Sequence, residues 1–210
     1  MADGLGGLPA GAVASGLAVN ILSRLINKST NDTVLRDIIL DGFEKTNQTI
    51  ISQGIGSATT LAVAEITDNY IRTYHVGDST ILITGQRGKI KLQTVAHSPM
   101  GYAVESGLLE ENEAVHHDER HIVSNVVGAA DMSITVGSNI KLSKYDTLLI
   151  ASDGVFDNLY VDEIVEIIRK GSLKNAAEQL VYKCNERMLD NDPDKPGHKD
   201  DLSFILFRLK

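Results

Sequence analysis

The chain has 210 residues, 42% hydrophobic and 23% charged, which is ordinary for a globular protein large enough for one core. Its net charge is −8, and it has no Trp and no basic run, so the composition argues against a nucleic-acid-binding protein. The single cysteine, Cys184, excludes an internal disulfide bond, and we expect it to be a small core residue.

The first apolar segment does not have the pattern of a targeting signal or a membrane span. Residues 8–25 follow no basic region and contain Asn20 and Arg24, so we expect a cytoplasmic protein. After Pro9, which suits a first helical turn, apolar residues recur every four positions and predict an amphipathic helix. The face that we expect to point to the core consists of Val13, Leu17, Ile21 and Leu25.

A second helix is predicted over residues 32–53. Asn31 or Asp32 is a suitable cap, and Gly54 a suitable end. The apolar positions that keep helical spacing are Leu35, Ile38, Ile39, Phe43 and Ile50.

From residue 58 the apolar pattern alternates, which is typical of strands. We predict strands over 58–66, 70–76, 79–84 and 89–95, with turns at 67–69 and 85–88. Because short turns separate them, we expect these strands to be hairpin-linked and antiparallel.

The alternation stops between residues 96 and 120. A short helix is predicted over 105–115, after His97-Ser98-Pro99. The histidines here raise the alternative of a zinc site, but no cysteine accompanies them, and the run His-His-Asp-Glu-Arg-His reads as a solvated charged surface. The histidines concerned are His97, His116, His117 and His121.

The rest of the chain completes an α+β pattern. We predict strands over 121–127, 132–136 and 147–151, helices over 161–170 and 173–189, a loop over 191–198, and a closing strand at 199–207. Helices at both ends with hairpin strands between them predict antiparallel sheets packed face to face with helices outside.

An acidic residue stands where the strand over 147–151 ends. The run Leu148-Leu149-Ile150-Ala151-Ser152 leads into Asp153, and Gly154 allows a sharp turn there. If the chain then turns helically, Asp157 returns to the same side and offers a second oxygen ligand to a hard cation. Taken alone, the stretch is equally well an Asp-Gly turn with Asp157 as a helix cap.

Further acids occupy similar positions elsewhere. Asp3 lies in Ala2-Asp3-Gly4-Leu5-Gly6-Gly7, Asp78 lies between two predicted strands, and the pair Asp200-Asp201 opens the last one. This set, in this order, resembles the metal-dependent protein phosphatases, the type 2C serine/threonine phosphatases. The resemblance covers the chain from Asp3 to Arg208, and Gly56-Ser57-Ala58-Thr59-Thr60 resembles the family's Gly-Ser-Thr-Ala entry to its sheet.

The resemblance implies an α-β-β-α sandwich and one phosphatase domain over residues 1–210, with a flap subdomain at about 97–120. It also implies hydrolysis of phosphoserine and phosphothreonine in proteins by water that two Mn²⁺ or Mg²⁺ ions activate, with an optional third ion. A metal-activated water needs no protein nucleophile. We expect a monomer whose partner is a phosphoprotein substrate.

By resemblance, each acid receives a role. Asp3 would bridge both metals, the Gly4 carbonyl would ligate one of them, and Asp153 and Asp200 would complete the other. Catalysis through metal-bound water would thus depend on Asp3, Asp153 and Asp200. Asp201 stands where the family has Asn and would support the ligands, and the optional third metal would use Asp78, Asp153 and Asp157.

The chain also departs from the family. Family members carry, before the Asp-Gly run, a phosphate-binding Arg, an acidic metal ligand and two strands, whereas only Met1 and Ala2 precede Asp3. Leu5 stands where some members have a His proposed as general acid. We therefore expect an N-terminally truncated form that keeps the fold but has low turnover. The alternative is a catalytically weak metal-binding pseudophosphatase that acts as a regulatory interaction module.

A nucleotide-binding loop over residues 4–11 is a further alternative. No strand precedes these residues, and they contain neither Gly-Lys-Ser nor a Gly-x-Gly-x-x-Gly pattern, so the sequence argues against it.

Overall fold

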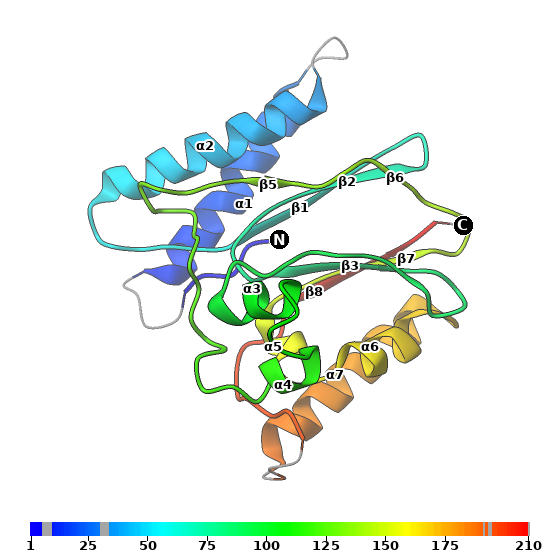
Figure 1. Cartoon of the computed structure of the whole chain (residues 1–210). Helices are drawn as coiled ribbons and strands as arrows, with labels where there is room; N and C mark the ends of the chain where they lie inside the picture. Colours follow the sequence, from blue (N-terminus) through cyan, green and yellow to red (C-terminus); the bar gives the residue numbers. More distant parts are fainter. Residues whose placement is uncertain (6–9, 30–33, 191, 193–194, 210) are drawn as a thin grey trace. The chain divides into compact units, whose positions relative to one another are not determined.

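The chain folds into two units, each with an antiparallel sheet and its own helices (Figure 1). The structure, a computed structural model, describes residues 1–5, 10–29, 34–190, 192 and 195–209. The first unit comprises Met1–Ser79 and Val123–Ile140, and the second comprises Thr80–Ile122 and Lys141–Lys210. The predicted α+β class with antiparallel sheets is confirmed.

The first unit contains two long helices and a four-stranded sheet. The helices are α1 (Gly11–Lys28) and α2 (Leu35–Gln53). The sheet has the order β1 (Leu61–Thr67), β2 (Tyr70–Val76), β5 (Thr135–Val136), with β6 (Ile140–Lys141) also pairing with β2. Asp68 and Asn69 join β1 to β2 with φ values of 49° and 64°, a left-handed turn that Asp and Asn tolerate and that matches the twist of a hairpin.

The core-facing side of α1 differs from the prediction. Ala14, Ala18 and Leu22 are buried, whereas Val13 is 52% exposed. α2 approaches this face closely, because a Cβ on Gly42 would meet Leu22 Cδ1 at 2.4 Å and the glycine leaves room for the leucine. The four-residue spacing was right, but the face was shifted by one position.

The ends of α2 were predicted in part. Gly54, with φ of 66°, ends the helix as expected. The N-cap is Val34, not Asn31 or Asp32, and these two residues, like Pro9, lie outside the described residues. The predicted apolar face is confirmed, since Ile39, Phe43 and Ile50 lie in the core of this unit.

The second unit is built on the sheet β4-β3-β7-β8. Its strands are β3 (Thr80–Thr84), β4 (Ile90–Gln93), β7 (Thr147–Ala151) and β8 (Phe204–Arg208). Its helices are α3 (Pro99–Glu105), α4 (Glu111–Ala114), α5 (Asp153–Phe156), α6 (Val161–Ile168) and α7 (Leu173–Leu189). The core joins β7 to α6 and α7, and Cys184 lies in it, fully buried, as predicted.

Three predictions about connections were wrong. β2 and β3 do not form a hairpin, because they belong to different sheets, and the chain leaves the first sheet through Gly77, which has a φ of 104°. Residues 121–127 form no strand; only Val127 pairs, in an isolated bridge with Thr59. The helix predicted over 105–115 is replaced by the short α3 and α4.

The position of α3 has a local cause. The Ser98 hydroxyl accepts a hydrogen bond from the Gly101 N–H (2.9 Å), and Pro99 occupies the first turn, so Ser-Pro starts a helix.

No helix among the described residues is long and apolar enough to cross a membrane.

Candidate metal centre

The pairing of β7 with β8 brings two acid-bearing segments together. The strands are antiparallel, with Ala151 opposite Phe204, and the Ser152 N–H donates to the Ser203 carbonyl at 3.0 Å. The end of β7 and the start of β8 therefore lie at the same edge of the sheet. Asp153 follows the first and Asp200-Asp201 precede the second, so the structure gathers these predicted residues within the second unit.

The chain turns helically after Asp153, as expected. The Gly154 N–H donates to Asp153 Oδ1 at 2.8 Å, and the Asp157 N–H donates to the Asp153 carbonyl at 2.7 Å. Asp157 is the C-cap of α5, and its Oδ2 lies 3.6 Å from Arg120 Nε. The helix-cap interpretation of Asp157 is thus confirmed, and its role as an ion ligand stays a prediction.

Gly154 has no room for a side chain. A Cβ there would meet the Asp201 carbonyl oxygen at 2.1 Å, closer than any real contact. The backbone after Asp153 therefore packs directly on the backbone of Asp201, a close approach that only glycine permits.

A buried asparagine, which the sequence analysis missed, holds the same two segments together. Asn158 Nδ2 donates to the carbonyls of Gly154 and His198, each at 2.9 Å, and its Oδ1 accepts from the His198 N–H at 2.8 Å. Asn158 is fully buried. Its only sequence signal is a polar residue in a largely apolar stretch, which does not reveal a partner 40 residues away.

Within the first unit, Thr60 contacts Asp3 and the two residues that flank Asp78. The Thr60 N–H donates to the Asp3 carbonyl at 2.8 Å, and the Asp3 N–H donates to Thr60 Oγ1 at 3.0 Å. The same Oγ1 lies 2.7 Å from Ser79 Oγ, and a Cβ on Gly77 would meet Thr60 Cγ2 at 2.6 Å. Since Leu61 pairs with Val76, the segments carrying Asp3 and Asp78 meet at one end of the β1–β2 hairpin.

Gly4 also requires the absence of a side chain. It forms a bridge with Thr59, and a Cβ would meet the Gly11 carbonyl oxygen at 2.2 Å. Gly6 and Gly7 of the same run lie outside the described residues.

The predicted site residues thus fall into two sets. The first unit holds Asp3, Gly4 and Asp78, and the second holds Asp153, Asp157, Asp200 and Asp201. In the part of the chain that the structure describes, no three His, Cys, Asp or Glu side chains gather as a metal-binding group. The donors are carboxylate and carbonyl oxygens, the class that suits Mg²⁺ and Mn²⁺, so the residue types fit the implied ions.

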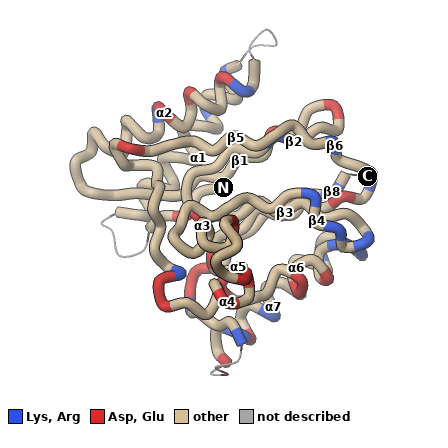
Figure 2. Tube along the Cα trace, in the orientation of Figure 1, with Lys and Arg blue, Asp and Glu red and all other residues tan. Residues whose placement is uncertain are grey.

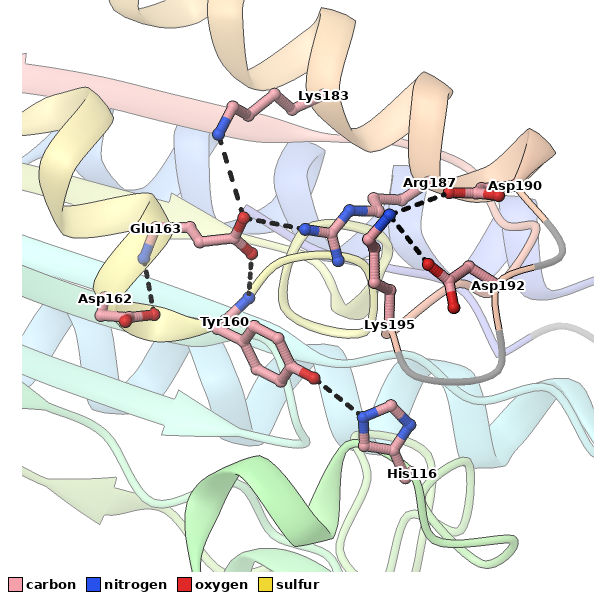
Figure 3. Close-up of polar contacts among 9 residues, drawn as sticks. All are labelled: His116, Tyr160, Asp162, Glu163, Lys183, Arg187, Asp190, Asp192 and Lys195. Carbon is pink, nitrogen blue, oxygen red and sulfur yellow. Dashed lines mark hydrogen bonds and ion pairs between the residues drawn. The ribbon is translucent and has the colours of Figure 1, made fainter.

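The histidines make other contacts. His97 is buried with its ring 6.4 Å from that of Tyr102, and His116 Nε2 lies 3.0 Å from the Tyr160 hydroxyl (Figure 3). His116, His117 and His121 are exposed, as predicted for a solvated charged surface, whereas His97 packs in the interior.

Comparison with known proteins relates this chain to one protein family. Residues 1–183 match the family model described as protein phosphatase 2C. The chain is 33% identical to the protein phosphatase PhpP of Streptococcus pneumoniae over 201 residues, which cover 91% of this chain and 81% of PhpP.

Solved structures show the same fold. The serine/threonine phosphatase of S. agalactiae is 31% identical, with a TM-score of 0.77 over 88% of this chain and 79% of that one. The catalytic domain of the serine/threonine phosphatase PstP, solved in complex with two manganese ions, has a TM-score of 0.78 at 22% identity. The match covers 98% of this chain and 84% of the PstP chain. At this identity, the PstP likeness shows the fold alone.

The hydrogen bonds of Asn158 predict a specific loss of stability. Asn158→Ala leaves buried backbone groups of Gly154 and His198 without partners, so we expect urea unfolding to show a loss of about 3 kcal/mol. The matched control is Asn125→Ala, because Asn125 bonds to the backbone and hydroxyl of Ser133 at the surface. Water can replace them there, so the control should lose less than about 1 kcal/mol. Equal losses would show that Asn158 does not hold the two segments together.

The contact at Gly154 predicts a second loss. Gly154→Ala forces the Asp201 backbone to move, and thermal unfolding should show a destabilisation of at least about 2 kcal/mol. Gly16 on α1, where a Cβ would meet nothing within 4 Å, is the control. Gly16→Ala should stabilise by about 0.5–1 kcal/mol. A neutral Gly154→Ala would show that the two segments are not held in contact.

Proposed function

The chain belongs to the protein phosphatase 2C family, and on this basis we propose that it hydrolyses phosphoserine and phosphothreonine in proteins with the help of Mn²⁺ or Mg²⁺. The observation that carries the proposal is the pairing of β7 with β8, which brings Asp153 and Asp200-Asp201 to one edge of a sheet. By the resemblance described above, Asp153 and Asp200 would be metal ligands, and relatives at more than 30% identity are named as protein phosphatases.

The proposed ligands are Asp3, Gly4, Asp153 and Asp200, with Asp78, Asp157 and Asp201 as supporting or optional positions. When bound, two such ions neutralise the phosphoryl oxygens and lower the pKa of a water so that it can attack at neutral pH. The role of this chain is to present oxygen donors on backbone that hydrogen bonds hold in place. Asp153 is held by its own helical turn, and the Asp3 backbone by Thr59 and Thr60.

The cysteine is not a candidate nucleophile. Cys184 is fully buried on α7, and burial raises the pKa of its thiol to about 11. The reactive form of cysteine is the thiolate, so at neutral pH this side chain is both inaccessible and protonated. This supports a mechanism in which water attacks the phosphorus.

Metal binding should stabilise the fold. A ligand at 100 times its dissociation constant adds about 2.7 kcal/mol, which is about 5–10 °C in Tm for a chain of this length. We expect this shift with free Mn²⁺ in the wild type and its loss in Asp153→Asn, which removes a charged ligand. Asp41→Asn, on the exposed face of α2, is the control and should keep the shift. The same shift in Asp153→Asn would refute its assignment as a ligand.

Activity should depend on metal and not on the thiol. Hydrolysis of an aryl phosphate and of a phosphothreonine peptide should require Mn²⁺ or Mg²⁺ and stop when a chelator is added. Cys184→Ala should retain the rate, because the thiol is protonated and buried. Loss of activity in a folded Cys184→Ala variant would instead favour a cysteine nucleophile.

A further inference from the structure

A groove of about 930 Å³ lies within the second unit. It is lined by the β3–β4 turn and the start of β4, by the start of α4, by most of α6, and by two residues of α7. None of the residues assigned above to the metal centre lines it, so it is a separate feature of this unit.

The groove combines an apolar floor with an acidic rim. Val161 and Val165 of α6 are buried beneath it, and Ile90 of β4, 41% exposed, forms part of one wall. Five lining residues are acidic and two are basic: Glu110, Glu111, Asp162, Glu163 and Glu166 against Arg87 and Lys183. Acidic positions are marked in red on α4 and α6 in Figure 2.

Two of these acids are neutralised within the unit. Glu163 Oε1 lies 2.8 Å from Arg187 Nη2 and 3.9 Å from Lys183 Nζ, as Figure 3 shows. Glu166 Oε1 lies 2.8 Å from Arg169 Nε, and this pair lowers the pKa of the Glu166 carboxyl. Their charge is therefore already balanced.

The other three acids have no cationic partner among the described residues, although each is oriented by a neutral donor. The Glu110 carboxylate accepts from the backbone N–H of Glu113, and Asp162 Oδ1 accepts from the Glu163 N–H at 2.8 Å. Glu111 accepts from the Gln93 side chain. Three oriented carboxylates around an apolar floor complement a segment that carries both basic and apolar side chains.

We propose that this groove binds a lysine- or arginine-rich segment of the phosphoprotein substrate, next to the phosphorylated residue. The inference rests on the proposed function, because it supplies the substrate preference of that reaction. The chain's own net charge of −8 acts in the same direction by attracting basic partners.

The groove lies within reach of the proposed metal centre along the chain. Val161 comes four residues after Asp157, an optional position of the proposed centre, and four residues span at most about 14 Å. A bound extended peptide advances about 3.4 Å per residue. The basic residues that the groove selects should therefore stand within about four positions of the phosphorylated residue.

The test compares two phosphothreonine peptides of equal length with the 210-residue protein and Mn²⁺. One carries Lys and Arg at positions within four residues of the phosphothreonine, and the other carries Gln there. We expect kcat/KM to favour the basic peptide by about tenfold at low salt. The preference should largely vanish at about 1 M salt, where the screening length is about 3 Å.

A charge-neutral variant localises the effect. The triple variant Glu110→Gln, Glu111→Gln, Asp162→Asn keeps the hydrogen-bond acceptors, and its ratio of kcat/KM for the two peptides should fall towards one. The control, Asp41→Asn, Glu44→Gln, Asp131→Asn, removes the same charge from exposed positions of the first unit and should keep the wild-type ratio. Fluorescence anisotropy with the unphosphorylated basic peptide should show weaker binding to the groove variant only.

The outcomes separate the two proposals. If both peptides are hydrolysed at equal rates, or if both triple variants lower the ratio equally, the groove does not select basic segments. Binding of the basic peptide without any effect on kcat/KM would overturn its role in substrate selection. If neither peptide is hydrolysed, the proposed function fails, and the anisotropy measurement still decides whether the groove binds a basic segment.

Discussion

The antiparallel pairing of β7 with β8 is the constraint on which the site in the second unit depends. It brings Asp153 and the Asp200-Asp201 pair, 47 positions apart in the chain, to one edge of the sheet. Main-chain pairing alone sets the register, whereas the final approach needs two further features. Gly154 lets the backbones touch, and the buried Asn158 bonds both segments. These contacts fix the backbone that carries the proposed ligands.

In the first unit, other residues bring two segments together in a similar way. There the hairpin of β1 and β2 sets the register, and Thr60 bonds to the backbone of Asp3 and to the Ser79 hydroxyl. In both units a polar side chain joins a strand end to a neighbouring loop, and a glycine removes the steric obstacle. The acidic groove lies along α6, which begins a few residues after Asp157. This helix carries part of the charge that we assign to substrate selection.

Helices and strands whose apolar residues recur at a regular spacing were predicted well. The strand over 147–151 and the helix over 173–189 have the predicted bounds, because a buried strand and a one-sided apolar helix each leave a clear pattern. Asp78 and Asp153 lie just beyond β2 and β7, as predicted from the glycines beside them, whereas their role as ligands stays a prediction. Local pattern failed where tertiary contacts decide: β2 and β3 separate into different sheets, and α1 turns Ala14 rather than Val13 to the core. Asn158 was missed because its role depends on a carbonyl far away in the sequence.

The most direct test of this account is to locate a bound Mn²⁺ by its effect on backbone amide NMR signals. Substoichiometric Mn²⁺ should broaden the signals of Asp153, Gly154 and Asp201 first, because the account places the ion at the shared end of β7 and β8. Signals from the middle of α2, such as that of Asp41, should persist. Selective broadening around the histidines at 116, 117 and 121, with Asp153 and Asp201 unaffected, would contradict the central claim.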